Sequence, residues 1–200
     1  MADEMVPELR AAADRLMHTG GYLRHLANEM RANELERHCK ATGLTVRQTV
    51  GHIVLWLELE ARALGRYVAG EAMFDEPFDE EAINREFAEQ SKEAPIAELL
   101  TRYRHAYDRT VETYGRVTAE MAAVPVGDTR LATLALQWTG HPERHALDFA
   151  EALPRLRFDP LLLDWALHAE LRDPSELHRQ LKLAEAARAY LKSREDTDDA

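Results

Sequence analysis

Apolar and small residues repeat along most of the chain at alternating steps of three and four, the period of a packed α-helix. A pair of glycines, Gly20 and Gly21, interrupts the first repeat, which lies within residues 6–30. Each glycine costs a helix about 1 kcal/mol relative to alanine. The pattern therefore predicts one long helix that either bends at the glycines or is closely approached there by a neighbour. The repeat consists of Leu9, Ala13, Leu16, Gly20, Leu23, Ala27 and Met30.

Two further helix starts are marked by capping residues. Thr45 followed by Gln48 forms a capping box, in which each side chain bonds the other's backbone N–H. A broad apolar face follows it and predicts a second long helix. After a loop over residues 70–78, Asp79 is placed to cap a short helix that runs to about Ser91.

The third repeat opens after Pro95 and is the most regular of the chain. Three of its eight positions are tyrosines, which predicts core residues whose hydroxyls find a partner or solvent, or alternatively phenols that face a polar cavity. The repeat consists of Ile96, Leu100, Tyr103, Tyr107, Thr110, Tyr114, Val117 and Met121. A turn over residues 125–128 follows, and Asp128 or Thr129 is the predicted N-cap of a fourth helix over residues 130–153.

Two Asp-Pro pairs predict two more helices, one from Asp159-Pro160 to Leu171 and one from Asp173-Pro174 to about Lys192. The predicted fold class is all-α, a four-helix bundle with additional C-terminal helices. We expect the bundle to occupy residues 1–155. Residues 156–200 form a helical extension packed on it, ending in an acidic tail.

Composition narrows the function classes. Of 200 residues 46% are hydrophobic and 30% charged, which is typical of a soluble globular domain. The longest uncharged apolar run is far too short to span a membrane, and the N-terminus lacks the pattern of a signal peptide, so we expect a cytoplasmic protein. A net charge of −11 disfavours nucleic acid as a partner. The single cysteine, Cys39, is interpreted as a bystander thiol rather than a nucleophile.

The fourth predicted helix carries the candidate chemistry. His141 and His145 lie one turn apart, and Asp148 lies on the same face. Two imidazoles at this spacing can reach one metal ion, although the pair alone also arises by chance. Pro142 removes a backbone hydrogen bond and Gly140 weakens the same turn, so a kink is predicted beside His141.

The second predicted helix adds two polar residues on or beside an apolar face. His52 lies at the edge of that face and Glu60 near its centre. A carboxylate among apolar neighbours is costly unless it is paired, protonated or bound. Glu60 is therefore an acceptor behind a metal ligand, a substrate contact, or the buried partner of an arginine, and the arginine pair is the default.

Two segments resemble the signature segments of the DinB/YfiT-like superfamily of metal-dependent four-helix bundles: TVRQTVGHIVLWLELE in the second helix and TLALQWTGHPERHALD in the fourth. The resemblance covers about residues 5–153. It implies that His52, His141 and His145 bind a divalent metal, zinc or nickel. Members include thiol-S-transferases that use bacillithiol, mycothiol or glutathione, and a mycothiol-dependent maleylpyruvate isomerase. The resemblance also implies a homodimer.

Three neutral imidazoles leave a coordination position open, which is the arrangement of a catalytic metal rather than a structural one. The leading hypothesis is a transferase or hydrolase that activates a low-molecular-weight thiol, or water, for attack on a small electrophile. Asp148, Glu60 and Tyr107 are supporting candidates, Asp148 as the residue that orients a ligand histidine. The alternative is a stress-response or ligand-sequestering bundle without catalysis, in which a metal is structural or absent and the histidines are polar core residues.

Overall fold

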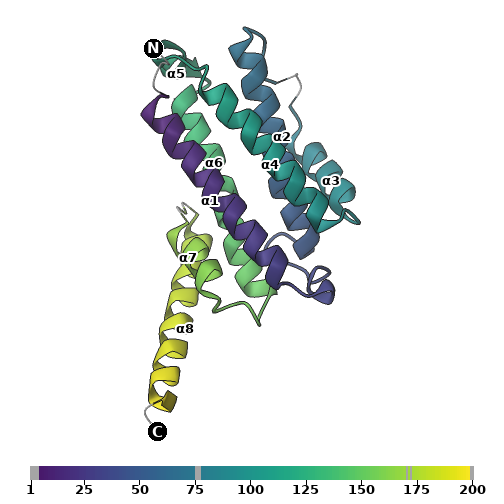
Figure 1. The fold of residues 1–200 in the computed structure, drawn as a ribbon, viewed down its shortest axis with the longest axis vertical. Coiled ribbons are helices and arrows are strands. Elements are labelled where there is room, and N and C mark those ends of the chain that lie inside the picture. Colours follow the sequence, from purple (N-terminus) through teal and green to yellow (C-terminus); the bar gives the residue numbers. More distant parts are fainter. Residues whose placement is uncertain (1–4, 75–77, 170, 172, 199–200) are drawn as a thin grey trace.

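The computed structural model describes residues 5–74, 78–169, 171 and 173–198. Four long helices lie side by side and form the bundle (Figure 1). They are α1 (Pro7–Glu29), α2 (Val46–Val68), α4 (Ile96–Tyr114) and α6 (Leu131–Ala152). Shorter elements connect or extend them: η1 (Ala32–Glu34), α3 (Glu80–Ser91), α5 (Ala119–Ala123), β1 (Pro125–Val126), β2 (Thr129–Arg130), α7 (Pro160–His168) and α8 (Pro174–Asp198). The all-α bundle with additional C-terminal helices is confirmed.

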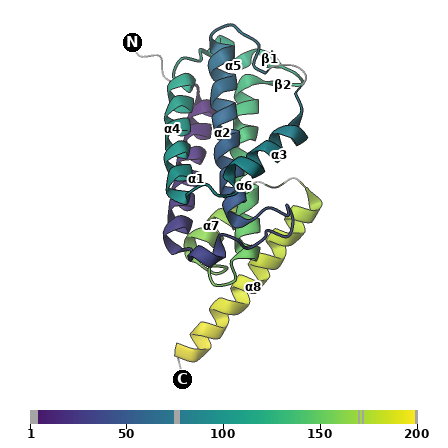
Figure 2. The same cartoon turned by 90° about the vertical axis from the view of Figure 1, so that its right-hand side faces the viewer.

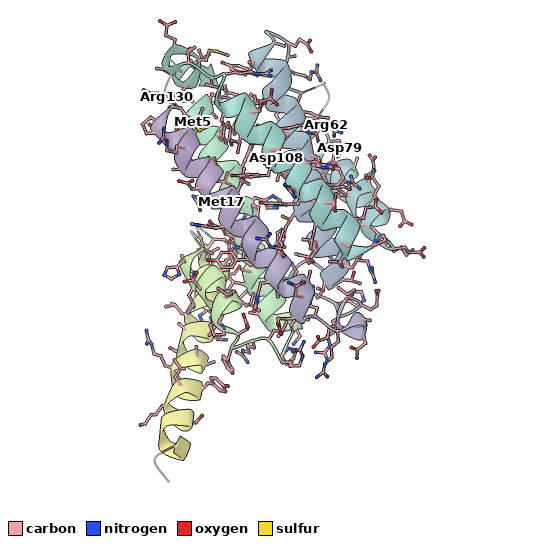
Figure 3. The ribbon with its side chains drawn as sticks, in the orientation of Figure 1. Met5, Met17, Arg62, Asp79, Asp108 and Arg130 are labelled. Atoms are coloured by element: carbon pink, nitrogen blue, oxygen red, sulfur yellow. The ribbon has the colours of Figure 1, made fainter. Side chains whose placement is uncertain are left out.

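The predicted caps form where the sequence places them. The Thr45 hydroxyl accepts from the Gln48 N–H at 3.1 Å, and the Gln48 amide oxygen accepts from the Thr45 N–H at 3.0 Å. Asp79 accepts from the Ala82 N–H at 2.9 Å and begins α3 (Figure 3). These bonds satisfy backbone donors that the first helical turn leaves unpaired.

The close approach of a neighbouring helix explains why one of the two glycines in α1 lacks a side chain. A Cβ atom at Gly20 would lie 2.8 Å from the ring of Tyr103 on α4, whereas nothing lies within 4 Å of a Cβ at Gly21. The Tyr103 hydroxyl donates to the Leu16 carbonyl at 2.6 Å. Tyr103 is thus the predicted core tyrosine, and its ring fills the space that Gly20 leaves.

The predicted boundaries around α4 and α6 are wrong in two places. The apolar repeat predicts a helix through Met121, but α4 ends at Tyr114, and Thr118 caps the separate helix α5. Neither Asp128 nor Thr129 caps α6, because Thr129 pairs with Val126 in a two-stranded hairpin around Gly127. The helix begins only after the hairpin ends, with no side-chain cap. It continues as helix across Pro142, and the kink there stays a prediction.

The C-terminal helices differ from the bundle in how they are buried. Asp159 and Asp173 cap α7 and α8 as predicted, but α7 ends at His168 rather than Leu171 and α8 extends past Lys192 to Asp198. Trp165 of α7 is 3% exposed and stacks on rings from α1 and α6. By contrast, α8 runs away from the bundle along much of its length (Figure 2). The division of the chain at residue 155 stays a prediction.

None of the helices in the described part of the chain combines the length and apolar character that a membrane span requires.

Candidate metal centre

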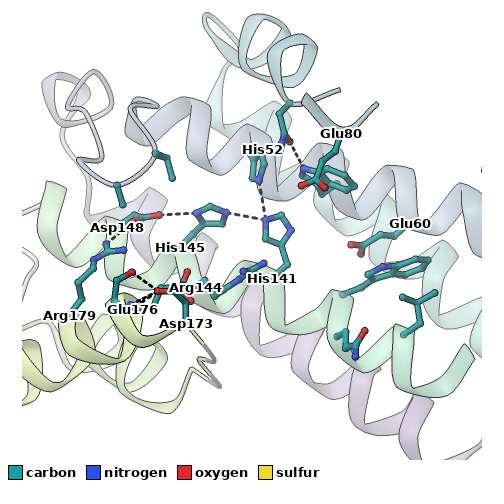
Figure 4. A pocket seen from close by; sticks show the side chains of 18 of the residues that line it. His52, Glu60, Glu80, His141, Arg144, His145, Asp148, Asp173, Glu176 and Arg179 are labelled. Carbon is teal, nitrogen blue, oxygen red and sulfur yellow. Dashed lines mark hydrogen bonds and ion pairs between the residues drawn. The ribbon is translucent and has the colours of Figure 1, made fainter. Parts of the chain in front are cut away.

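Three histidines from two helices converge on one point. His52 lies on α2, and His141 and His145 lie one turn apart on α6. The Nε2 atom of His141 is 3.0 Å from that of His52 and 3.2 Å from that of His145 (Figure 4). His52 and His145 are buried, and His141 is half-buried. The packing of α2 against α6 therefore brings together residues that are 89 positions apart.

One of the three rings has a fixed tautomer. His145 Nδ1 lies 2.9 Å from an oxygen of Asp148, in a site where both residues are buried. An ionised carboxylate only accepts hydrogen bonds, so the Nδ1 atom carries the hydrogen, and the metal-binding, neutral form of the ring then has its lone pair at Nε2. The predicted orienting contact of Asp148 is thus present in the structure, and it turns the lone pair toward the other two histidines.

The three Nε2 atoms cannot satisfy one another. An imidazole nitrogen offers either one hydrogen or one lone pair in the ring plane, and His141 Nε2 contacts both of the other nitrogens. At most one of the two contacts is a well-formed hydrogen bond. A cation that accepts three lone pairs at once removes this conflict, so the donor set itself suits a metal ion.

The distances and charges suit a metal as well. Two nitrogens bound tetrahedrally to zinc at about 2.0–2.1 Å lie about 3.3–3.4 Å apart, close to the two separations of 3.0 and 3.2 Å at His141. Burial, followed by the proximity of His145, lowers the pKa of His52 to about 3 and holds the pKa of His141 well below its usual value. Both rings are therefore neutral near pH 7, which is the protonation state that metal coordination needs.

The carboxylate behind His145 is held by the C-terminal helix. Arg179 of α8 donates to Asp148 at 2.7 Å and to Glu151 at 2.8 Å. Burial alone would raise the pKa of Asp148, but the hydrogen bonds and charges of His145 and Arg179 outweigh it and hold that pKa below its usual value. Asp148 is therefore ionised, and a residue outside the bundle contributes to the arrangement of the site.

The histidines line a cavity of about 810 Å³. One side of it is a wall of four aromatic rings from α2, α6 and the segment before α3. Trp56 is fixed by a hydrogen bond from its indole N–H to Asn84 of α3 at 2.9 Å. Polar residues of α6 and of the start of α8 also line the cavity. The four rings belong to Trp56, Phe74, Phe78 and Trp138.

Glu60 lines the same cavity, without the arginine partner that the sequence suggested as the default. It is 7% exposed and forms no hydrogen bond or ion pair with the described residues. Burial raises the pKa of this carboxyl to about 8.

Two other candidates lie elsewhere. Tyr107 lines a separate cavity between α1 and α4, so the structure does not bring it to the histidines. Burial raises the pKa of the Cys39 thiol to about 11, and the Thr49 hydroxyl contacts its sulfur at 3.4 Å. A buried, protonated thiol is inert, which agrees with its interpretation as a bystander.

Sequence reasoning missed the aromatic wall and Arg179. Trp56 lies one turn after His52, and Trp138 one turn before His141, which is a signal that both rings face the ligands' side of their helices. Phe74 and Phe78 lie in a loop without periodicity. For Arg179 the sequence offers no signal, because its role depends on how α8 meets α6.

The family comparison agrees with this geometry. The sequence profile described as "Mycothiol maleylpyruvate isomerase N-terminal domain" matches residues 16–150, which is more than half of the chain. The matched region contains all three histidines, and α7 and α8 lie beyond it. No curated protein and no solved structure matches the chain. The chain therefore belongs to the mycothiol maleylpyruvate isomerase N-terminal domain family, a family of the DinB/YfiT-like superfamily that is associated with mycothiol-dependent enzymes.

Proposed function

We propose that the protein is a metal-dependent enzyme that activates a low-molecular-weight thiol, or water, for attack on a small electrophile. The observation that carries the proposal is the convergence of three Nε2 atoms, one of them with its tautomer set by Asp148, at the wall of a cavity large enough for a substrate. Zinc or nickel is the proposed ion, because three imidazoles suit either metal.

His52, His141 and His145 would hold the ion. When bound, a divalent ion lowers the pKa of a coordinated thiol or water and so makes a nucleophile available near neutral pH. The chain's own contribution is orientation and charge. Asp148 and Arg179 hold the His145 ring in place, and burial keeps His52 neutral.

The aromatic and the polar residues of the cavity fit two kinds of ligand. The aromatic wall suits the apolar body of an electrophile and excludes water from it. The polar residues, which include Arg144 and those at the start of α8, suit the hydroxyl and carboxyl groups that a small biological thiol carries. Mycothiol is the first thiol to test, since it appears in the description of the family.

Metal content tests the site. We expect protein purified without a His tag to bind zinc or nickel one-to-one by elemental analysis, and His145→Ala to abolish it. His168→Ala, which removes an exposed histidine on α7, is the matched control and should bind like the wild type. One-to-one metal in His145→Ala would show that these three residues are not the ligand set.

Turnover tests the chemistry. Conjugation of mycothiol or glutathione to a generic electrophile should be accelerated by the protein, abolished by a chelator and restored by the ion. The alternative, a ligand-sequestering or stress-response bundle, instead gives one-to-one capture of a ligand without turnover. We also propose a homodimer, from the superfamily resemblance, and a cytoplasmic location, from the sequence pattern. Sedimentation velocity tests the dimer, and cell fractionation tests the location.

A further inference from the structure

The position of Glu60 is unusual for a carboxyl group. It lies on α2, two turns after His52, and its carboxyl group points into the histidine cavity on the far side of His141 from Asp148 (Figure 4). Only 7% of its surface is exposed, so it is more than nine-tenths buried. Among the described residues, none donates a hydrogen bond to its carboxyl group or forms an ion pair with it. A structural glutamate at such depth is normally hydrogen-bonded or ion-paired. Glu60 has neither kind of partner in the described part of the chain, and it lines the cavity, where a ligand can reach it.

The surroundings of Glu60 favour a neutral carboxylic acid. Arg179, a charged guanidinium that lines the cavity, is already bonded to Asp148 and Glu151. Burial is the cause that raises the pKa of Glu60, and the resulting value of about 8 leaves most of the group protonated at pH 7. A protonated carboxyl group can donate a hydrogen bond or a proton to a ligand in the cavity. The titratable and charged groups that line the cavity with it, or act on it, come from several elements: His52 on its own helix; His141, Arg144, His145 and Asp148 on α6; Tyr103 and Tyr114 on α4; Glu80 on α3; and Asp173, Glu176 and Arg179 at the start of α8.

We propose that Glu60 is the proton donor of this site, acting on electrophiles that must take up a proton when the nucleophile adds. The assignment rests on the proposed function. With a carbonyl-conjugated alkene, the thiol sulfur forms a bond to the β-carbon, and the alkene π pair shifts toward the carbonyl. The enolate formed takes the proton of Glu60. The Glu60 carboxylate then recovers a proton from the next thiol as that thiol ionises, so the net reaction adds one thiol to one alkene.

An electrophile that loses a halide needs no such proton, and this gives the test its control reaction. We compare the metal-loaded wild type, Glu60→Gln and Glu86→Gln with mycothiol as the thiol. The electrophiles are ethacrynic acid, a carbonyl-conjugated alkene, and monochlorobimane, which releases chloride. Glu86 is an exposed carboxylate outside the cavity, so Glu86→Gln makes the same chemical change where no effect is expected.

We expect Glu60→Gln to lower kcat for ethacrynic acid about 100-fold or more, the size of a typical acid–base contribution. Its rate with monochlorobimane should stay near that of the wild type. An equal loss with both electrophiles would make Glu60 a structural residue, and no loss with either would exclude it from the reaction. Each of these results overturns the assignment.

Protein stability gives a readout that does not depend on activity. Folded Glu60 keeps its proton up to about pH 8, whereas an unfolded glutamate releases it near its ordinary value of 4.5. The folded state therefore binds more protons between these values, and its stability must fall as pH rises through them. Urea unfolding of metal-free protein should show this fall for the wild type and a shallower one for Glu60→Gln. Subtracting the stability of Glu60→Gln from that of the wild type at each pH cancels the contribution of every titratable group that the two proteins share.

The two proposals fail in different ways. A wild type that turns over neither electrophile overturns the proposed function and the donor role with it. A wild type that is active, but whose stability falls with pH no more steeply than that of Glu60→Gln, overturns the donor role alone, because Glu60 would then be ionised.

Discussion

Replacing Asp148 by asparagine isolates one hydrogen bond of the metal site. Asparagine has nearly the same shape, and its side-chain oxygen can still accept from Arg179, which lies 2.7 Å from Asp148. Its NH₂ group then faces His145 Nδ1. An amide NH₂ only donates, so the imidazole must accept at Nδ1 and move its hydrogen to Nε2, the atom that would bind the metal.

The expected loss follows from this tautomer change. Replacing an outer-shell partner of a ligand histidine typically costs about 10- to 100-fold in metal affinity, or about 1.4–2.8 kcal/mol. Asp148→Asn should reach the upper part of this range although it preserves volume. Asp148→Ala removes the carboxylate without offering a new donor, so it should cost no more than the asparagine variant. This order is opposite to the one that lost packing would give.

Competition for zinc against a chromophoric chelator measures these affinities. Glu112→Gln is the matched control, because Glu112 is an exposed carboxylate on α4 that pairs with Arg116 and does not line the histidine cavity. We expect its zinc affinity to equal that of the wild type. Wild-type affinity in Asp148→Asn, or a larger loss in Asp148→Ala than in Asp148→Asn, would refute the tautomer argument.

Three further predictions concern the scaffold. Gly51→Ala should destabilise the fold by about 1–3 kcal/mol in urea unfolding, because its Cβ would lie 2.0 Å from the Cβ of Ser91. Nothing lies within 4 Å of a Cβ at Gly65, so Gly65→Ala should instead raise the free energy of unfolding by up to about 1 kcal/mol. Similar effects of the two substitutions would contradict the close packing of Gly51 against Ser91. Thr45→Ala should cost about 1 kcal/mol through the lost cap, measured in the same assay, and no change would show that the capping box is dispensable. The hydrogen bond from Arg155 lowers the pKa of Glu34, so the ionised carboxylate stabilises the fold above pH 4.5, the ordinary pKa of glutamate, and this stabilisation is lost as pH falls below that value. Glu34→Gln should make the loss of stability in acid smaller. An unchanged midpoint of acid unfolding in Glu34→Gln would argue against this role of Glu34.

Most helices could be predicted from the sequence because their causes are local. A cap acts over three residues, as at Thr45 and Asp79, and an apolar repeat describes one face of one helix. The error at the end of α4 shows the limit of periodicity. Val117 is buried and Met121 partly buried although the helix has ended, so the repeat continues where the backbone has turned. A pattern of burial does not by itself report helical backbone.

The site was partly predictable for a different reason. The spacing of His141 and His145 predicts a shared face, but only the superfamily resemblance connects them with His52. Whether an arginine lies beside Glu60 depends on how the helices pack, and a local sequence pattern does not report that. The same holds for Arg179, whose contact with Asp148 joins helices that are separated by α7.

The chain of contacts from Arg179 through Asp148 to His145 has a thermodynamic consequence. If an ion at the histidines and the docked start of α8 each favour the same arrangement of Asp148, the two equilibria share a coupling free energy and act on each other by the same factor. Filling the site should slow amide hydrogen exchange in the first turns of α8. Conversely, weakening the contact of α8 with Asp148 should lower the affinity for the ion by the same factor. The C-terminal helix would then regulate metal occupancy from outside the bundle.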